Sequence, residues 1–100
     1  MSSTYINLPL RRAILARDEY RCIYCESEDF LTIDHVVAEM WEGPTKATNL
    51  VACCGFCSVL KGVVPFDLHA MHLERLGKGD AQVIIARVKA HLAIPTIPNE

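Results

Sequence analysis

The sequence has no long apolar run and contains few glycines or prolines. The longest apolar stretch, residues 50–60, is interrupted by Gly55 and Ser58, whereas a membrane-spanning helix needs about 20 consecutive apolar residues. With 51% apolar residues and only 5 glycines and 5 prolines, the composition argues against a disordered or collagen-like chain. We therefore expect a globular protein without a membrane span, organised as one domain over residues 1–100.

An excess of charge of one sign is also missing. The 10 lysines and arginines are balanced by 12 acidic residues, so the net charge of −2 gives no overall attraction to nucleic acid. The acidic residues are concentrated, because residues 26–45 hold six of them and no basic residue. Such a segment is typical either of a cation site or of a solvated loop, and charge alone does not separate the two.

The N-terminus lacks the features of a secretory signal. Residues 1–8 have neither a basic start nor an apolar block. We therefore expect a cytoplasmic protein. In a reducing compartment the 5 cysteines more often bind metal than form disulfides.

Hydrophobic patterning and capping residues predict a mixed α+β fold. The predicted elements are, in order, a helix over 8–17, a strand over 31–37, a loop over 38–48, a strand over 50–53, and helices over 55–61, 67–76 and 81–92. Asn7, Asp67 and Asp80 are the expected helix caps. Pro95 and Pro98 predict an irregular tail after the last helix.

Two Cys-x-x-Cys pairs give the strongest signal in the sequence. The pairs, Cys22–Cys25 and Cys54–Cys57, are separated by 28 residues. Each can present two thiolates from one tight turn, and two such turns supply the tetrahedral four-sulfur shell that zinc prefers. Two redox motifs or ordinary buried cysteines are the alternatives, but neither pair follows the βαβ pattern of a thioredoxin-like fold. We expect a structural Zn²⁺ that is needed for folding, with Cys53 left over as a core residue.

Asp34 and His35 are adjacent at the end of the predicted strand. Neighbouring side chains of a strand point to opposite sides, so the two residues are expected to have different roles. A carboxylate is the oxygen ligand that Mg²⁺ or Mn²⁺ requires, and a neutral imidazole can accept a proton from water near neutral pH. Taken alone, the pair is better explained as a surface aspartate beside a histidine at the end of a strand.

The motifs around this pair follow a characteristic order. They are Asp34-His35, then Asn49-Leu50, then Cys54-Gly-Phe-Cys57-Ser58, followed by Lys61. Over about residues 10–67 the sequence closely resembles the HNH endonuclease family. The resemblance implies a ββα-metal finger, also called a His-Me finger, framed by the four-cysteine zinc site and flanked by N-terminal and C-terminal helices, the latter over residues 67–93.

The resemblance also implies an activity, namely metal-dependent hydrolysis of DNA phosphodiester bonds by an endonuclease or nickase. His35 matches the general base, and Asp34 matches the carboxylate that binds a catalytic Mg²⁺ or Mn²⁺. Asn49 matches the residue that ties down the loop and orients the histidine. Ser58 stands where the family has His or Asn as the second protein ligand of that cation, so weak metal binding or loss of activity would follow if serine cannot replace them.

DNA is the partner that the resemblance implies, and no protein partner is indicated. The basic residues that could contact phosphates are Arg11, Arg12, Arg17, Arg21 and Lys61. Alternatively, Arg17 or Arg21 pairs with neighbouring acidic residues, and Lys61 only stabilises the end of its helix.

Three further residues have two interpretations each. His69 and His72 could supply the missing ligand, but a partly exposed helix face is the simpler expectation for both. Trp41 could stack at DNA or pack over the finger.

An alternative function follows from the same residues. A zinc-stabilised module that binds DNA or protein, with its catalysis weakened, is favoured by Ser58 and by the acidic net charge. The intact Asp34, His35 and Asn49 favour the enzyme, because a binding module does not need a base beside a metal ligand. A small redox protein is the third hypothesis.

Overall fold

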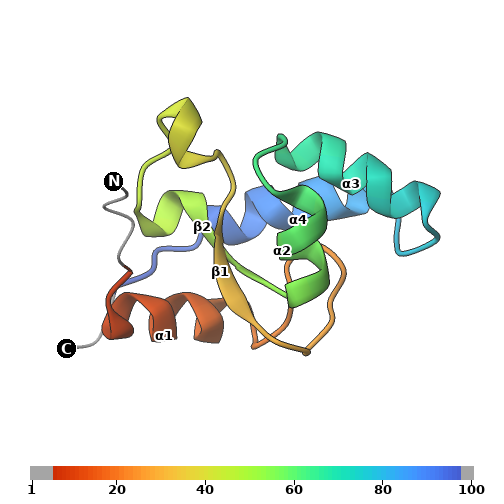
Figure 1. The fold of residues 1–100 in the computed structure, drawn as a ribbon. Coiled ribbons are helices and arrows are strands. Elements are labelled where there is room, and N and C mark those ends of the chain that lie inside the picture. Colours follow the sequence, from red (N-terminus) through yellow and green to blue (C-terminus); the bar gives the residue numbers. More distant parts are fainter. Residues whose placement is uncertain (1–5, 98–100) are drawn as a thin grey trace.

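The computed structural model describes residues 6–97 and shows a small α+β fold (Figure 1). The elements are α1 (Leu8–Arg17), β1 (Thr32–His35), the 3₁₀ turns η1 (Glu39–Trp41) and η2 (Ala47–Asn49), β2 (Leu50–Cys53), α2 (Gly55–Lys61), α3 (Phe66–Arg75) and α4 (Ala81–Leu92). The predicted α+β class is confirmed. Pro98, part of the predicted tail, lies outside the described residues.

The helix boundaries follow from local capping. Asn7 Oδ1 accepts a hydrogen bond from Leu10 N at 2.9 Å, and Asp80 caps α4. Gly62 ends α2 with a φ of 51°, in the left-handed region that glycine adopts without a steric cost. The prediction that Asp67 caps α3 is wrong, because the cap is Pro65 and Asp67 lies in the first helical turn.

The two strands form one antiparallel sheet that leads directly into α2. Thr32 pairs with Cys53, and His35 pairs with Leu50. The first strand ends two residues earlier than predicted, because the side chain of Asn49, and not a strand partner, takes up the backbone N–H and C=O of Val37. The order strand, loop, strand, helix is the ββα arrangement that the sequence resemblance implied.

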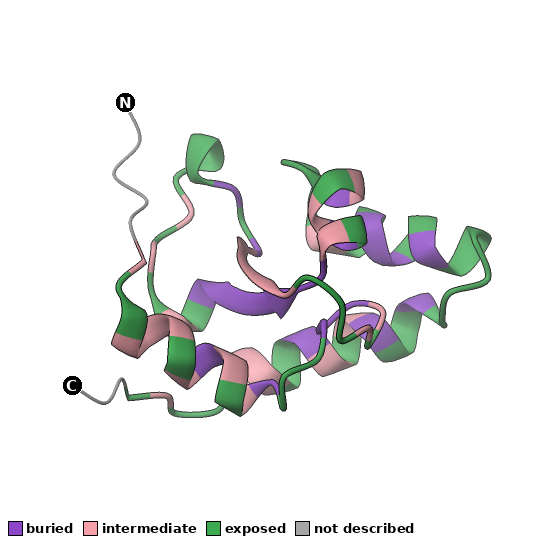
Figure 2. Cartoon of the chain, turned by 60° about the horizontal axis from the view of Figure 1, so that its bottom comes forward, coloured by how far each residue is buried: buried purple, intermediate pink, exposed green. Residues whose placement is uncertain are grey.

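The second strand lies in the core, whereas the first is only half-buried. Figure 2 shows β2 buried along its whole length and β1 at intermediate burial. Helices α1 and α4 both contact β2, and α4 also packs against α3. One strand is thus available to carry side chains toward the surface while its partner anchors the sheet.

A buried polar network joins α1, β2 and α4. The Asp18 carboxylate accepts hydrogen bonds from Arg17 at 2.8 Å and from Ala52 N at 2.8 Å, and it lies 2.9 Å from His91 Nδ1. A buried carboxylate is tolerated only when such partners satisfy it. The network therefore fixes the N-terminal helix against the sheet.

The helices are short. The longest, α4, has 12 residues. Within residues 6–97, no helix is both long and apolar enough to cross a membrane.

Candidate metal centre and candidate active site

The four cysteines of the two Cys-x-x-Cys pairs come together at one point. Cys22 and Cys25 lie in the turn after α1, whereas Cys54 caps α2 and Cys57 lies in its first turn. Their sulfur atoms all lie within 4.8 Å of one another. Zinc–sulfur bonds of about 2.3 Å in a tetrahedron place the sulfurs about 3.8 Å apart, so the cluster fits such an ion. The cysteines are therefore positioned to hold a metal ion.

The thiols of the four-cysteine cluster shift one another's pKa values. Hydrogen bonds from the neighbouring thiols of Cys25, Cys53 and Cys57 lower the pKa of Cys22. The same interaction with Cys22 raises the pKa of Cys25 to about 11 and raises that of Cys57 further. Because a metal binds thiolates, loading the site requires these thiols to release their protons.

Cys53 is a core residue, as predicted. Its side chain is fully buried in β2, and it belongs to the main apolar cluster. Its Sγ lies 3.5 Å from the carbonyl oxygen of Cys54.

The Asp34 carboxylate is held by two side chains from other elements. Tyr24 Oη donates a hydrogen bond to Asp34 Oδ2 at 2.8 Å, and Lys61 Nζ lies 3.1 Å from the same oxygen. Burial raises the pKa of Asp34, although Lys61 and Tyr24 oppose that shift. Burial also raises the pKa of Tyr24, so its hydroxyl keeps the proton that it donates.

His35 lies beside Asp34 in a pocket of about 350 Å³. The lining residues are Ile33, Asp34, His35, Ala38, Glu39, Met40, Gly62 and Val63. His35 Nε2 lies 2.9 Å from Thr45 Oγ1, in the loop that follows β1. The pocket therefore combines a carboxylate and an imidazole whose orientations are both set by hydrogen bonds.

Asn49 fixes the loop between the two strands. Its side-chain oxygen accepts from Val37 N at 2.9 Å, while its side-chain nitrogen donates to Val37 O at 3.0 Å and to Pro44 O at 2.9 Å. A Cβ at Gly43 would collide with the carbonyl of Val37, so the loop closes this tightly only with glycine there. Thr45, which contacts His35, is thus carried by an anchored loop.

Ser58 and the two histidines of α3, the candidate second ligands, differ in how far they are buried. Ser58 is half-buried in α2 and lies outside the set of residues that lines the Asp34–His35 pocket. His72 is exposed, as predicted. The expectation of a partly exposed face is wrong for His69, which is fully buried and packs its ring edge-on against Tyr24 with 4.8 Å between centroids.

Two of the five basic residues predicted to contact DNA are buried in ion pairs. Arg17 pairs with Asp18, which is the alternative that the sequence left open. The Lys61 side chain is fully buried, and its ammonium pairs with Asp34 and also donates to the carbonyl of His35 at 3.1 Å. Both side chains are paired inside the fold, so they are the least accessible of the five basic residues.

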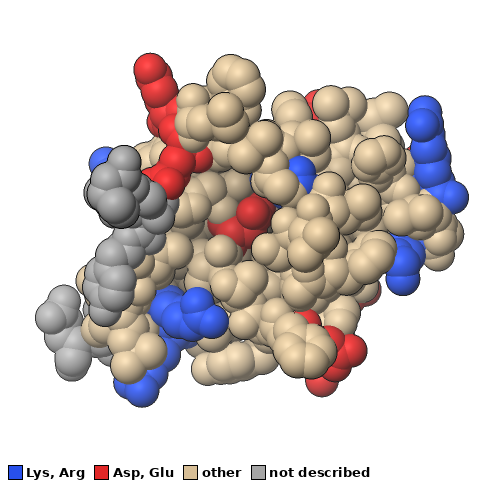
Figure 3. Space-filling view, viewed as in Figure 1, with Lys and Arg blue, Asp and Glu red and all other residues tan. Residues whose placement is uncertain are grey.

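The other three basic residues lie at or near the surface. Arg12 is exposed, and Arg21 is exposed with Glu28 at 3.7 Å. Arg11 is half-buried and donates to the carbonyl of Leu31. Figure 3 shows blue side chains over α1 on the same face as a recessed acidic group in the centre of the view.

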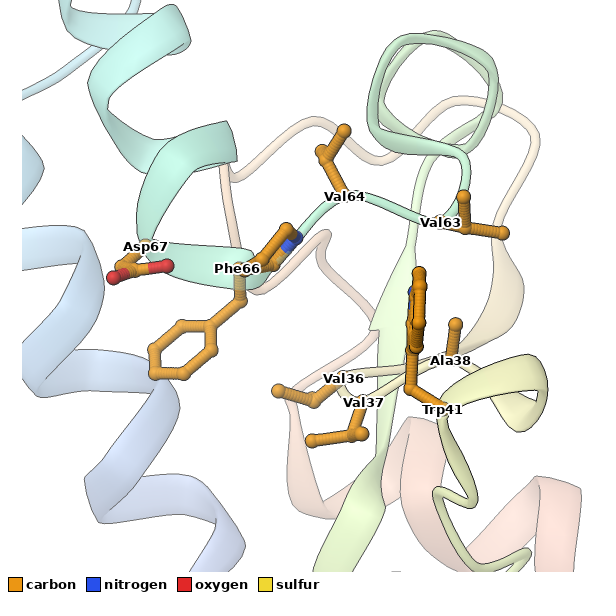
Figure 4. A pocket seen from close by; sticks show the side chains of 9 residues that line it. Val36, Val37, Ala38, Trp41, Val63, Val64, Phe66 and Asp67 are labelled. Atoms are coloured by element: carbon orange, nitrogen blue, oxygen red, sulfur yellow. The ribbon is translucent and has the colours of Figure 1, made fainter.

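A second, apolar pocket adjoins the first. It has a volume of about 510 Å³, and it shares Ala38 and Val63 with the Asp34–His35 pocket. Figure 4 shows the Trp41 indole extending from η1 toward Val63. Trp41 is 63% exposed, so it forms a wall of this pocket and does not belong to the core.

Sequence reasoning missed two residues that contact the candidate catalytic pair. In the sequence Tyr24 is only a spacer within a Cys-x-x-Cys pair, and Thr45 is only one residue of the predicted loop over 38–48. Both contacts join residues ten positions apart across a turn or loop whose path the sequence does not reveal. The position of Tyr24 between the two cysteines of a Cys-x-x-Cys pair is the sequence signal that points to it.

The comparisons with known proteins agree with the geometry. Residues 22–62 match the family model described as HNH endonuclease. Neither the curated proteins nor the solved structures give a match. The resemblance to the HNH endonuclease family is thereby confirmed over residues 22–62, the segment that runs from the first cysteine of the metal cluster to the end of α2.

Proposed function

We propose that this protein is a metal-dependent DNA endonuclease or nickase that hydrolyses phosphodiester bonds. The observation that carries the proposal is the pairing of Asp34 with His35 in one pocket, at the end of β1 and within the segment that matches the HNH family. We also propose that the four cysteines hold Zn²⁺, that residues 1–100 form one domain, and that the protein is cytoplasmic.

Asp34 is the proposed protein ligand of a catalytic Mg²⁺ or Mn²⁺. A divalent cation at this site would stabilise the negative charge that develops on the phosphate and on the leaving oxygen. The Asp34 side chain is only 13% exposed, and it lines the pocket. Ser58 stays the proposed second donor, but its side chain is shorter than the His or Asn that the resemblance places there.

His35 is the proposed general base. If its Nε2–H donates to Thr45 Oγ1, the other ring nitrogen, Nδ1, carries no proton and can accept one from water. Asn49 supports this geometry, because it anchors the loop that carries Thr45. The chain would thereby keep both the tautomer and the ring orientation that the reaction needs.

DNA would approach the face that carries α1 and the recessed acidic group. Arg12 and Arg21 are the proposed phosphate contacts, since both are exposed. Their small number and the net charge of −2 predict modest affinity with a weak dependence on salt.

The direct test is cleavage of supercoiled plasmid by zinc-loaded protein in Mg²⁺, Mn²⁺ or Ni²⁺. Wild type should nick the plasmid only when one of these ions is added, and Asp34→Asn should require far more metal or lose activity. Activity without added divalent metal, or equal metal responses of the two proteins, would reject Asp34 as the ligand.

A binding module without catalysis is the second candidate. The observation that favours it is the Lys61 ammonium on Asp34 Oδ2, because this positive charge already neutralises the carboxylate and weakens its attraction for a metal ion. Such a module would retard a DNA duplex on a gel at the same protein concentration for wild type and Asp34→Asn, and neither protein would nick plasmid in any of the three metals.

A further inference from the structure

The Tyr24 hydroxyl and the Lys61 ammonium meet on a single oxygen of Asp34. Both described contacts of the carboxylate go to Oδ2, at 2.8 Å from Tyr24 and 3.1 Å from Lys61. Among the described residues, no hydrogen bond to Oδ1 is found. A carboxylate held at one oxygen cannot rotate freely, so its other oxygen has a fixed position.

The tyrosine is itself held rigidly. Its side chain is fully buried, and its ring packs edge-on against His69. Its backbone carbonyl accepts a hydrogen bond from Arg87 of α4 at 3.0 Å. It also lies between Cys22 and Cys25, so the turn that carries it begins and ends at two of the four clustered cysteines.

We propose that Tyr24 is a positioning residue, which fixes the Asp34 carboxylate so that Oδ1 is presented to the catalytic cation. The inference rests on the proposed function, because it assumes that Asp34 binds that cation. A ligand that is already oriented loses less conformational freedom when metal binds, and loss of such a supporting hydrogen bond typically weakens metal binding 10–100-fold. The tyrosine does not touch the cation or the substrate in this account.

The test measures Mn²⁺ affinity without DNA, on zinc-loaded protein, from the electron paramagnetic resonance signal of free Mn²⁺. Tyr24→Phe should weaken Mn²⁺ binding about 10–100-fold. It should leave zinc content and the melting temperature close to those of wild type, because the ring still packs on His69 and Lys61 still pairs with Asp34. Tyr24→4-aminophenylalanine, which restores a donor, should recover most of the affinity.

Two controls make the result interpretable. Tyr20→Phe removes a hydroxyl that is on an exposed side chain and should leave Mn²⁺ binding unchanged. Asp34→Asn, measured at a temperature at which it is folded and keeps its zinc, should weaken Mn²⁺ binding at least as much as Tyr24→Phe. If Tyr24→Phe fails to hold zinc, Tyr24→4-fluorophenylalanine fills the space of the hydroxyl without donating, and it should show the same loss of affinity.

The outcomes separate the two proposals. Wild-type affinity in the folded non-donating variants, together with loss of binding in Asp34→Asn, would overturn the positioning role and leave the proposed function standing. Equal Mn²⁺ binding by wild type and Asp34→Asn, or no binding by wild type, would overturn both, because the cation would not be held at Asp34.

Discussion

Lys61 Nζ lies 3.1 Å from Asp34 Oδ2, with the lysine side chain fully buried and the aspartate side chain 13% exposed. The pair joins the end of α2 to β1, which are the helix and the first strand of the ββα unit. The cation that the sequence suggested for DNA contact thus neutralises a carboxylate inside the fold. Removing one member of a buried pair leaves an uncompensated charge, which makes the pair testable by mutation.

Lys61→Met should destabilise the protein strongly. Loss of one partner of a buried ion pair costs roughly 3–5 kcal/mol, and the partial exposure of Asp34 favours the lower end of that range. Urea unfolding of zinc-loaded protein measures the effect, with Lys89→Met, on an exposed position of α4, as the control. Equal stabilities of the two variants would show that the pair adds nothing to the fold.

Loss of a cluster cysteine should abolish metal binding. Cys22→Ser and Cys57→Ser each remove one ligand of four, so both should lose zinc and the cooperative unfolding transition. Cys53→Ser should keep zinc, because Cys53 lies in the core outside the four-cysteine cluster. Metal analysis and thermal melts decide the matter, and full zinc content in both Cys22→Ser and Cys57→Ser would refute the assignment.

Acid should destabilise the protein partly through His69. Burial lowers the pKa of His69 from 6.5 to about 4, so below pH 6.5 the unfolded chain takes up a proton that the folded protein does not. The free energy of unfolding therefore falls as the pH drops toward 4, by up to about 1.4 kcal/mol per pH unit. Well above pH 6.5 the histidine is unprotonated in both the folded and the unfolded protein, so its burial causes no loss of stability from protonation there.

The variant that isolates this effect is His69→Phe. It should make the acid dependence shallower by up to one proton, whereas His72→Phe, on the exposed part of the same helix, should match wild type. Both ring nitrogens of His69 are buried without a described partner, so His69→Phe should also be no less stable at pH 7. Unfolding curves from pH 7 to pH 4 check both statements, and an unchanged slope in His69→Phe would place the titration elsewhere.

A better ligand at position 58 should strengthen the catalytic site. If Ser58 is a weak donor, Ser58→Asn or Ser58→His should raise cleavage at limiting Mn²⁺ or Mg²⁺, and Ser58→Ala should raise the metal concentration needed for half-maximal rate. The variants should fold alike, since Ser58 is only half-buried. Nicking is measured against metal concentration for all four proteins. An identical response of wild type and Ser58→Ala would remove Ser58 from the ligand set.

The sequence predicted the parts of the fold that depend on local pattern. Helix α1, strand β2, helix α2 and helix α4 have the expected bounds because Asn7, Gly62 and Asp80 are strong local signals. The metal cluster was predicted for a similar reason, since the spacing of a Cys-x-x-Cys pair already brings two sulfurs together.

Contacts between distant segments were not predictable from such patterns. The pairing of Lys61 with Asp34 spans the whole ββα unit, and a lysine at a helix end has the same sequence signature whether it is buried or solvated. The burial of His69 depends on Tyr24, which lies 45 positions earlier in the chain. Sequence periodicity gives the face of a helix but not the partner that covers it.

The rate of plasmid nicking in Mn²⁺ by zinc-loaded wild type and His35→Ala, purified side by side, tests directly whether His35 is the general base. His35 is half-buried on β1, so its loss should leave zinc content and the melting temperature nearly unchanged. If His35 removes a proton from the attacking water, the rate should fall by about 10²–10⁴-fold. Equal rates for the two proteins would rule out His35 as the base, because the nicking would then come from another base or from a contaminant.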